Sequence, residues 1–593
     1  MLRVGDRSAV TDDYSRRTVL GATGGVTLTA LPGGRLLQQD PENGRGPPGG
    51  SDVESLAIER VGRYETGEFD GGAEIVAYDA ARSRLFVVNS GAGRVEVLDV
   101  SDPAAPEQVA VIDAAGDVPD GGGANSVDVV GDLVAVAVEN EDPQAPGFIA
   151  LYDASRLQRM ALDEVGPLPD KVTISPDGNY VLSANEGEPA TDEEPGSRTD
   201  PGGSVSIIDV SDGVGGVQPT TLDFTPFDEQ VESLRREGVR VYGASAEDDD
   251  PKPSTDFEPE FITVASDSET AFVSLQENNA IATVDIPNAE ITDVSGLGFK
   301  DFSIEGNELD TSDADAGDAD AISLQNWPVK GMYQPDAIAA HEVAGTQYVL
   351  TANEGDSRDF EETTVADLTL ATDAFAPRLS ENPYVDSVEG LQAPENLGNL
   401  AVTNQLGDHD DDGEFEDLYL FGGRSFSAFE VADDGLELVY DSGNEFERTY
   451  AEQFPAGFQN ATESGPETEA VELGQVGDRT FAFVGIERGS GIFVYDVTTP
   501  TEARYVTTVL NRDFSVGFGD LAAEAEANPE SDEPGRAGDW SPEGVEFIPA
   551  GGSPTDAPLL AAGYEVSGTV ALFEVTPLPE SDGEPGADAP AED

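Results

Sequence analysis

The segment Asp170-Lys171-Val172-Thr173-Ile174-Ser175-Pro176-Asp177-Gly178 leads into Asn179-Tyr180-Val181-Leu182-Ser183-Ala184-Asn185-Glu186, which is the pattern of a β-hairpin. Two short runs of β-branched and apolar residues flank a Ser-Pro-Asp-Gly-Asn turn sequence. An aspartate stands before the first run and a glutamate ends the second. Because antiparallel pairing places the start of one strand beside the end of the next, these two acids should lie at one edge of a sheet.

The same pattern, an acid or amide, one residue and then Val or Ile, occurs seven times along the chain. Its openings are Glu74-Ile75-Val76, Asn125-Ser126-Val127, Asp170-Lys171-Val172, Glu260-Phe261-Ile262, Asp336-Ala337-Ile338, Glu469-Ala470-Val471 and Glu543-Gly544-Val545. Each is followed by a second apolar run, and often by a third that ends in Asp-Val, as at 95–100, 205–210 and 492–497. A lone small sheet cannot bury both of its faces, whereas sheets in a ring bury every face against a neighbour. We therefore predict an all-β chain folded as a seven-bladed β-propeller.

The two ends of the repeated region predict how such a ring closes. The last repeat has three strands, and the isolated apolar run 58–64 can supply the missing outer strand. Two alternatives remain open. A further strand pair at 418–421 and 426–431 would allow an eight-bladed ring, and a parallel β-helix is the structural rival, although its repeat would be shorter and more regular.

The flanking segments differ in composition from the repeats. Residues 1–40 contain Ser15-Arg16-Arg17-Thr18-Val19-Leu20 followed by a small, weakly apolar run, which predicts a twin-arginine signal peptide. Residues 41–56 are rich in Pro, Gly and acids and are predicted to be a disordered linker, and 577–593 a disordered acidic tail. The propeller domain is assigned to residues 57–576. The protein is therefore expected to be exported, and to be extracellular or held at the cell surface.

The charge balance excludes several classes of function. The 593 residues carry 119 Asp and Glu against 30 Lys and Arg, a formal net charge of −89. Such a surface repels phosphate backbones and anionic lipid, so nucleic-acid and membrane-surface roles are excluded. It suits a medium in which salt screens self-repulsion within about 3 Å at 1 M, which indicates a halophilic protein. No stretch predicts a transmembrane segment, no cysteine is present, and a monomer is expected.

Acids gather at the predicted sheet edge. The second apolar run is followed by a glutamate in six of the seven repeats, at Glu139, Glu186, Glu277, Glu354, Glu487 and Glu565, and acids such as Asp336 and Glu543 open the first run. Because the first strand of a propeller blade is innermost, these side chains should surround the mouth of a central channel. Haloadaptation combined with turn chemistry explains the pattern without a ligand. The alternative is that crowded carboxylates hold hard cations, of which Ca²⁺ fits best.

A second candidate metal site is a short acidic loop. Asp408, Asp410 and Asp412 occupy positions 1, 3 and 5, Gly413 position 6 and Glu416 position 9. This spacing opens a calcium loop, in which the glycine permits the bend that turns successive oxygens inward. It departs from the EF-hand pattern because position 12 is Tyr419. We predict that it binds Ca²⁺, with an acidic surface loop as the alternative.

Basic residues near the same edge raise the question of catalysis. Arg358 follows Glu354 by four residues, Arg424 precedes Ser425, and Arg488 follows Glu487. Cations held by carboxylates, together with guanidinium groups, could bind phosphate or sulfate, and a metal-bound water could attack phosphorus without a histidine. Arg358, Arg424 and Arg488 would then orient phosphate, with Ser425 as the candidate nucleophile. Local ion pairs that hold the blades together are the competing interpretation.

Several longer motifs resemble one family, the secreted propellers called choice-of-anchor I proteins, which are related to mesenchyme-specific cell surface glycoproteins and to YVTN-type propellers. The matching stretches include 172–178, 184–187, 331–338, 351–358, 423–427, 487–492, 542–545 and 565–569. The segment 465–469 departs from the family's Pro-Glu-Gly turn. The resemblance implies export and a propeller, and some halophilic members carry an alkaline phosphatase label.

Two functions follow from these observations. The first is a non-catalytic propeller that binds a small anionic ligand or a cell-surface partner at an acidic, cation-holding channel mouth. The alternative is a calcium-dependent phosphoesterase similar to alkaline phosphatases or phytases.

Overall fold

A computed structural model describes residues 53–579 except 69–70, 191–198, 217, 244–249, 313–321, 359, 381, 433–434, 459 and 517–533. The predicted signal peptide, most of the predicted linker and most of the predicted acidic tail lie outside the described residues. Strand β1 begins at Val53 and strand β33 ends at Pro579. The folded region therefore extends a few residues beyond both predicted limits of the domain.

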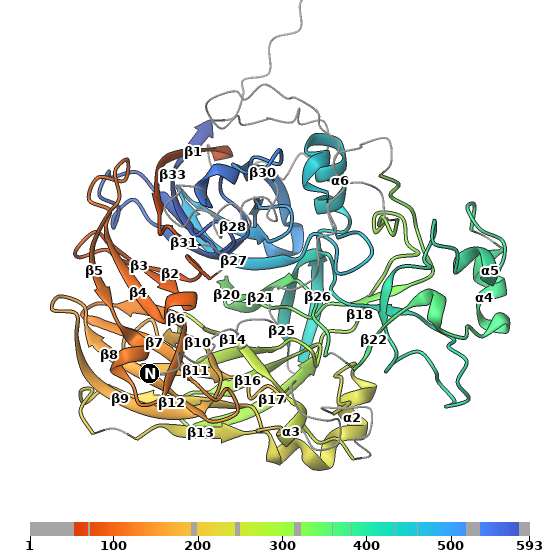
Figure 1. The fold of residues 1–593 in the computed structure, drawn as a ribbon, viewed down its shortest axis with the longest axis horizontal. Coiled ribbons are helices and arrows are strands. Elements are labelled where there is room, and N and C mark those ends of the chain that lie inside the picture. The colour runs from red at the N-terminus through yellow and green to blue at the C-terminus, as the bar shows by residue number, and fades with distance from the viewer. Residues whose placement is uncertain are drawn as a thin grey trace, which may run out of the picture.

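The described residues form seven four-stranded antiparallel sheets, six of them contiguous or nearly so in sequence (Figure 1). In chain order they are β2 (Val76–Asp79), β3 (Arg84–Asn89), β4 (Arg94–Asp99) and β5 (Glu107–Ile112); β6 (Gly121–Val130), β7 (Leu133–Asn140), β8 (Pro146–Asp153) and β9 (Gln158–Pro167); β10 (Pro169–Ile174), β11 (Tyr180–Asn185), β12 (Ser204–Asp209) and β13 (Thr220–Asp223); β14 (Pro259–Val264), β15 (Thr270–Leu275), β16 (Ala280–Asp285) and β17 (Glu290–Gly296); β20 (Ile338–Val343), β21 (Thr346–Asn353), β25 (Ser425–Ala432) and β26 (Gly435–Asp441); β27 (Thr468–Val476), β28 (Arg479–Ile486), β29 (Gly491–Asp496) and β30 (Arg504–Leu510); and β31 (Pro542–Ile548), β32 (Leu559–Tyr564), β33 (Thr569–Pro579) and β1 (Val53–Glu65).

The seventh sheet joins the two ends of the chain. Strand β1 pairs antiparallel with β33, with Ile58 opposite Val575 and Tyr64 opposite Val570. The predicted pairing of the run 58–64 with the last repeat is therefore present. Ile58 and Val575 are both buried in the core cluster shared by the sixth and seventh sheets, so the pairing is supported by packing as well as by main-chain hydrogen bonds.

The first strands of successive sheets contact one another in a cycle. Strand β2 touches β6, and the contacts continue from β6 to β10, β14, β20, β27 and β31 and return to β2. We call these seven the inner strands. The sheets fan outward from them, which is the arrangement of a β-propeller (Figure 1).

The burial of strand β3 shows why the apolar runs are continuous rather than alternating. Leu85 and Val87 pack in a cluster with residues of the seventh sheet, whereas Phe86 and Val88 pack with residues of the second sheet. All four are fully buried. A strand covered on both faces needs apolar residues at every position.

The insertions carry their own structure. Strands β18 (Phe299–Asp301), β19 (Lys330–Met332) and β24 (Tyr419–Leu420) form a three-stranded sheet, and β22 (Glu362–Thr364) pairs with β23 (Ala401–Thr403). Helices α4 (Thr372–Leu379) and α5 (Val388–Leu391) project beside them and pack on a separate apolar cluster that includes Trp327 and Phe375 (Figure 1). The remaining α-helices in the described part are α1 (Ala114–Asp117), α2 (Val231–Arg236), α3 (Pro253–Asp256) and α6 (Glu445–Gln453).

The additional strand pair that would have allowed an eighth blade belongs elsewhere. Residues 418–421 contain β24, which pairs in parallel with β19, and residues 426–431 lie within β25, the third strand of the fifth sheet. Within the described residues the pair therefore adds no further four-stranded sheet.

Candidate functional site

The predicted acids lie at the starts of the inner strands and just after the second strands. We call the two sets together the carboxylate rim, and its members in the described residues are Glu74, Glu139, Asp170, Glu186, Glu260, Glu277, Asp336, Glu354, Glu469, Glu487, Glu543 and Glu565. Many of these carboxylates interact electrostatically with one another. Burial, and then the charges of Asp336, Glu74, Glu487 and Asp170, raise the pKa of Glu543 well above its ordinary value.

Five carboxylates converge between the fifth and sixth sheets. Asp336, Glu354 and Glu469 each place one oxygen within 4.8 Å of the others, and Glu354, Glu467 and Glu487 do the same. Glu354 belongs to both groups. We call these five residues the central cluster. The structure therefore brings together three of the predicted metal ligands, Asp336, Glu354 and Glu487.

The central cluster has few neutralising partners. Arg488 donates from Nε to Glu467 over 2.5 Å, and its Nη1 lies 3.1 Å from Glu487 Oε1. Gln276 Nε2 donates to Glu354 over 2.6 Å. Burial, and then the charges of neighbouring carboxylates, raise the pKa of Glu354, Glu467 and Glu469 well above the ordinary value. Such a group must take up protons or hold a hard cation, because one guanidinium cannot offset five carboxylates.

The other predicted rim ligands are placed differently. Glu186 lies with Glu258 and Glu277 in a separate buried group between the third and fourth sheets. Glu543 and Glu565 belong to none of the close carboxylate groups found within the described residues. The main-chain N–H of Glu565 donates to the Ser541 carbonyl over 2.9 Å, which fixes the turn after β32.

Four further charged residues lie on inner strands: Asp128 on β6, Lys171 on β10, Glu472 on β27 and Glu546 on β31. Lys171 Nζ lies 4.2 Å from the centre of the Phe261 ring. Burial lowers the pKa of Lys171, against the opposing effect of Asp128 and other acids. Burial raises the pKa of Glu472 to about 7, although Lys171 acts in the opposite direction. Lys171 thus interacts electrostatically with several acids of the inner strands.

The predicted calcium loop is partly assembled. Asp408, Asp410 and Asp412 place one oxygen each within 4.8 Å of one another, and the charge of Asp412 is the largest cause of the raised pKa of Asp410. Gly413 has a φ of +86°, which is the bend that its position requires. Glu416 does not join this group. Its carboxylate instead accepts from the main-chain N–H of His409 over 2.8 Å.

Two of the three predicted phosphate-orienting arginines, Arg358 and Arg424, are buried in ion pairs. Arg358 donates from Nη1 to Asp256 over 2.7 Å and from Nη2 to Glu258 over 2.6 Å, and its guanidinium stacks 4.5 Å from the centre of the Tyr242 ring. Arg424 is 2% exposed and donates from Nη1 to Glu447 over 2.7 Å. These contacts are those of groups that join segments of the chain.

Ser425, the candidate nucleophile, is fully buried. Its hydroxyl donates to Asp441 over 2.6 Å and accepts from Asn353 over 3.2 Å. Histidine is absent from this network, and nothing there would expose the oxygen to a substrate. The environment favours a structural hydroxyl that links β21, β25 and the end of β26.

The sequence-based prediction missed Glu258 and Glu467. Each stands two residues before the acid that opens its inner strand, Glu260 and Glu469 respectively. The same position holds Leu168, Gln334 and Ser541 in other repeats, so no simple acid pattern marks it. The sequence signal for these residues was an acid two positions before the opening acid, and it occurs in only two repeats.

Every helix in the described part is too short or too polar to cross a bilayer.

Comparison with known proteins identifies the family. Residues 74–500 match the profile of the choice-of-anchor I domain, which is most of the chain. Gigasin-3a of Magallana gigas is 30% identical over 211 residues, 32% of this chain and 70% of that protein. The mesenchyme-specific cell surface glycoprotein of Strongylocentrotus purpuratus is 28% identical over 292 residues, 42% of this chain and only 36% of that protein.

Among solved structures, the WD40 domain of Toxoplasma gondii coronin is similar with a TM-score of 0.42 and 8% identity, covering 89% of this chain and 88% of that one. The sequence match, which spans the first five sheets and most of the sixth, is what assigns the family. The chain therefore belongs to the choice-of-anchor I family.

Proposed function

We propose that this chain is an exported, halophilic, non-catalytic β-propeller that holds Ca²⁺ in its carboxylate rim and binds a small anionic ligand or a cell-surface partner there. The twin-arginine motif at Arg16 and Arg17 supports the export route. An extracellular or surface location agrees with the family and with a relative named as a cell surface glycoprotein. The protein acts as a monomer in this proposal.

The proposed ring has seven blades and is closed by β1. Its support is the seven four-stranded sheets, the cycle of contacts between inner strands, and the antiparallel pairing of β1 with β33. In such a ring the inner strands surround an axis, and the rim acids at their ends surround one mouth. The central cluster then faces that mouth.

The observation that carries the binding function is the central cluster. Five carboxylates crowd around Glu354, and Arg488 is the cation that contacts them. Ca²⁺ favours six to eight oxygen ligands in flexible geometry, and carboxylates supply them. A bound Ca²⁺ with an open coordination position, beside Arg488, would attract a carboxylate, sulfate or phosphate group of a partner. The loop at Asp408, Asp410 and Asp412 is proposed as a second, surface calcium site.

Calcium titration of the full chain tests the proposal. We expect the Glu354→Gln variant to bind Ca²⁺ at least tenfold more weakly at the rim than the wild type, because Glu354 belongs to both close groups. Glu437→Gln, an exposed position on β26, is the matched control with the same change of charge. Calorimetry in high salt measures both. Equal calcium affinity in the two variants would reject the rim as a cation site.

Catalysis is tested in the same preparation. The buried contacts of Arg358, Arg424 and Ser425 are structural, which supports a protein without hydrolytic activity. We expect no turnover of a generic phosphomonoester, with or without a calcium chelator. Turnover that is lost on chelation would overturn the non-catalytic proposal in favour of the phosphoesterase. Weak binding of inorganic phosphate that requires Ca²⁺ would support the anionic-ligand function.

A further inference from the structure

A second carboxylate group is buried between the third and fourth sheets. Glu186 follows β11, Glu258 precedes β14 and Glu277 follows β15, and each places one oxygen within 4.8 Å of the other two. These side chains are 6%, 2% and 7% exposed. We call them the inter-sheet triad. Buried carboxylates this close repel one another unless protons or a cation intervene.

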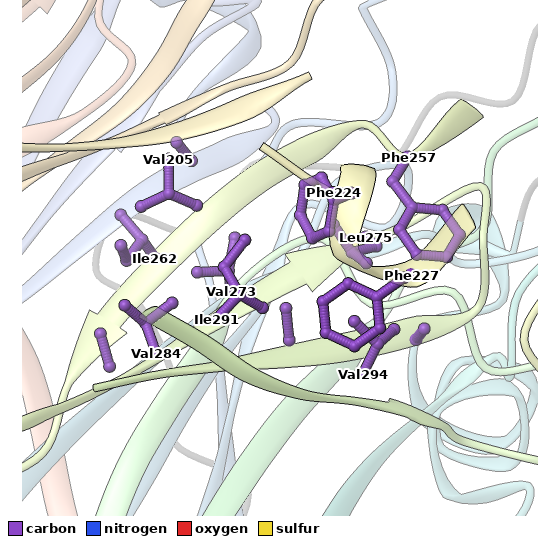
Figure 2. Close-up of a cluster of buried hydrophobic side chains, with 14 of the residues drawn as sticks. Val205, Phe224, Phe227, Phe257, Ile262, Val273, Leu275, Val284, Ile291 and Val294 are labelled. Atoms are coloured by element: carbon purple, nitrogen blue, oxygen red, sulfur yellow. The ribbon is translucent and has the colours of Figure 1, made fainter. Parts of the chain in front are cut away.

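The backbone that presents Glu258 is held firmly by packing. Phe257 is fully buried, with its ring 5.2 Å from that of Phe224 in an edge-on contact. Figure 2 shows both rings in the apolar cluster over β14 to β17, beside Leu275 near the end of β15. Asn278 accepts from the Glu258 main-chain N–H over 3.3 Å and donates to the Asp256 carbonyl over 3.0 Å. The triad is therefore placed by the core rather than by a loose loop.

The surrounding cations are already engaged. Arg358 is shared between Asp256 and Glu258. Arg240 pairs with Glu361, which also accepts from the Tyr242 hydroxyl over 3.0 Å. Two guanidinium groups thus serve three carboxylates before Glu186 and Glu277 are counted.

Glu277 is the independent sign of a missing ligand. Although its side chain is more than nine-tenths buried, in the described part of the chain it forms no salt bridge and accepts no hydrogen bond from another residue. One of its oxygens lies within 4.8 Å of an oxygen of Glu186 and an oxygen of Glu258, which are themselves acceptors. Apart from its own main-chain N–H, no donor within the described residues replaces the hydration that this carboxylate loses on burial, so an additional partner would stabilise it.

The triad has a counterpart related by the repeat. Between the fifth and sixth sheets, Glu354, Glu467 and Glu487 form a similar close group. Glu354 and Glu467 stand at the positions of Glu186 and Glu258, whereas the strand register places Glu487 at the position of Gln276, one residue before Glu277. Each set includes an arginine contact, Arg358 to Glu258 and Arg488 to Glu467. A glutamate at the position of Glu258 and Glu467 occurs in these two repeats, where other repeats carry Leu, Gln or Ser. A recurring set of this kind indicates a specific use.

We propose that Glu186, Glu258 and Glu277 form a buried divalent-cation site, of the kind that takes Ca²⁺, and that the ion ties the third sheet to the fourth. The site includes two residues of the carboxylate rim, Glu186 and Glu277, but it is structural and does not depend on ligand binding at the central cluster. The all-oxygen donor set fits a hard cation, and three carboxylates with Arg358 nearby leave room for additional carbonyl or water ligands. Removal of the ion leaves the mutual repulsion of the triad unrelieved.

The test compares Glu277→Gln with the wild type in thermal melts of the whole protein, first stripped of divalent ions and then supplied with Ca²⁺. Glutamine keeps the shape but removes one charge. We expect the stripped variant to melt at a higher temperature than the stripped wild type, because repulsion is relieved. With Ca²⁺ this order should reverse, and the bound calcium measured after desalting should fall by one equivalent per chain. Glu437→Gln is the matched surface control.

Each outcome is informative. A calcium stoichiometry unchanged in Glu277→Gln would overturn the proposal, as would a stabilisation by glutamine that persists at saturating Ca²⁺. Glu467→Gln separates the two sites, since it affects the counterpart group and leaves the inter-sheet triad intact. If Glu467→Gln removes one equivalent and Glu277→Gln removes none, calcium binding at the central cluster stands and this inference fails. Loss of an equivalent in Glu277→Gln alone supports this inference and rejects the central cluster as a cation site.

Discussion

At the scale of single residues, the main feature of the molecule is that its buried carboxylates outnumber the basic side chains that could neutralise them. Glu472 illustrates the consequence. Burial raises its pKa to about 7, while Lys171 opposes the shift and the charge of Asp128 adds to it. In the unfolded chain the same group titrates near about 4.3. The native state therefore binds this proton more tightly than the unfolded state does.

This difference predicts how stability depends on pH. The stabilising proton on Glu472 is present below about pH 4 and is lost as the pH rises through about 7, so the free energy of unfolding should fall across that window. In the Glu472→Gln variant we expect a flatter profile between pH 5 and 8 and a higher melting temperature at pH 8. Circular dichroism melts of metal-free protein measure both. Parallel profiles for variant and wild type would contradict the assigned shift, and Glu437→Gln controls for the change in net charge.

The positions of the site carboxylates could be predicted from the sequence more easily than the residues with which the charged side chains pair. The glutamates that follow the second strands were identifiable because they recur at fixed positions, and Glu186, Glu354 and Glu487 do enter close groups. The arginines were harder. Arg358 lies four residues from Glu354 in sequence but pairs with Asp256 and Glu258, which are a hundred residues away in the insertion before β14. The spacing of two residues in the sequence does not predict which partner a long side chain such as arginine will reach.

At the scale of strands, the repeat determines most of the fold. An inner strand opening with an acid, followed by a fully apolar second strand, predicts sheets buried on both faces, and the alternating burial of β3 between two neighbours agrees. The insertions could not be predicted in this way. Residues 418–421 look like a blade strand because they are apolar, yet β24 pairs with β19 in a separate small sheet. Local pattern identifies a strand but not its partner.

Strand β1 provides the element-scale prediction. Ile58 is 4% exposed in the cluster shared by the sixth and seventh sheets. Truncation to alanine removes buried methyl groups and leaves a cavity, which should cost about 2–5 kcal/mol of the free energy of unfolding. Val109→Ala on β5, where the side chain is 48% exposed, is the control and should change little. Denaturant titration measures both variants. A loss below about 0.5 kcal/mol in Ile58→Ala would mean that β1 contributes little to closing the structure.

At the scale of the whole molecule, a formal charge of −89 on 593 residues dominates the long-range energy. The repulsion acts in the folded state more strongly than in the expanded unfolded chain, because folding brings the charges closer together. Salt therefore stabilises the native state by screening. The buried groups are shielded from salt by the protein around them, so screening relieves the surface whereas the inter-sheet triad and the central cluster still need protons or divalent ions.

The two contributions can be separated by their salt dependence. At 1 M ionic strength the Debye length is already about 3 Å, so screening should be nearly complete by then. We expect the melting temperature of calcium-saturated protein to rise by several degrees between 0.2 and 1 M KCl and to level off towards 3 M. Calcium removal should lower the melting temperature at every salt concentration, because KCl cannot replace a divalent ion held by converging carboxylates. A melting temperature that climbs linearly to 3 M would instead indicate exclusion of salt from the surface, and a calcium effect that vanishes at 3 M KCl would place the bound ions on the exposed surface rather than between the sheets.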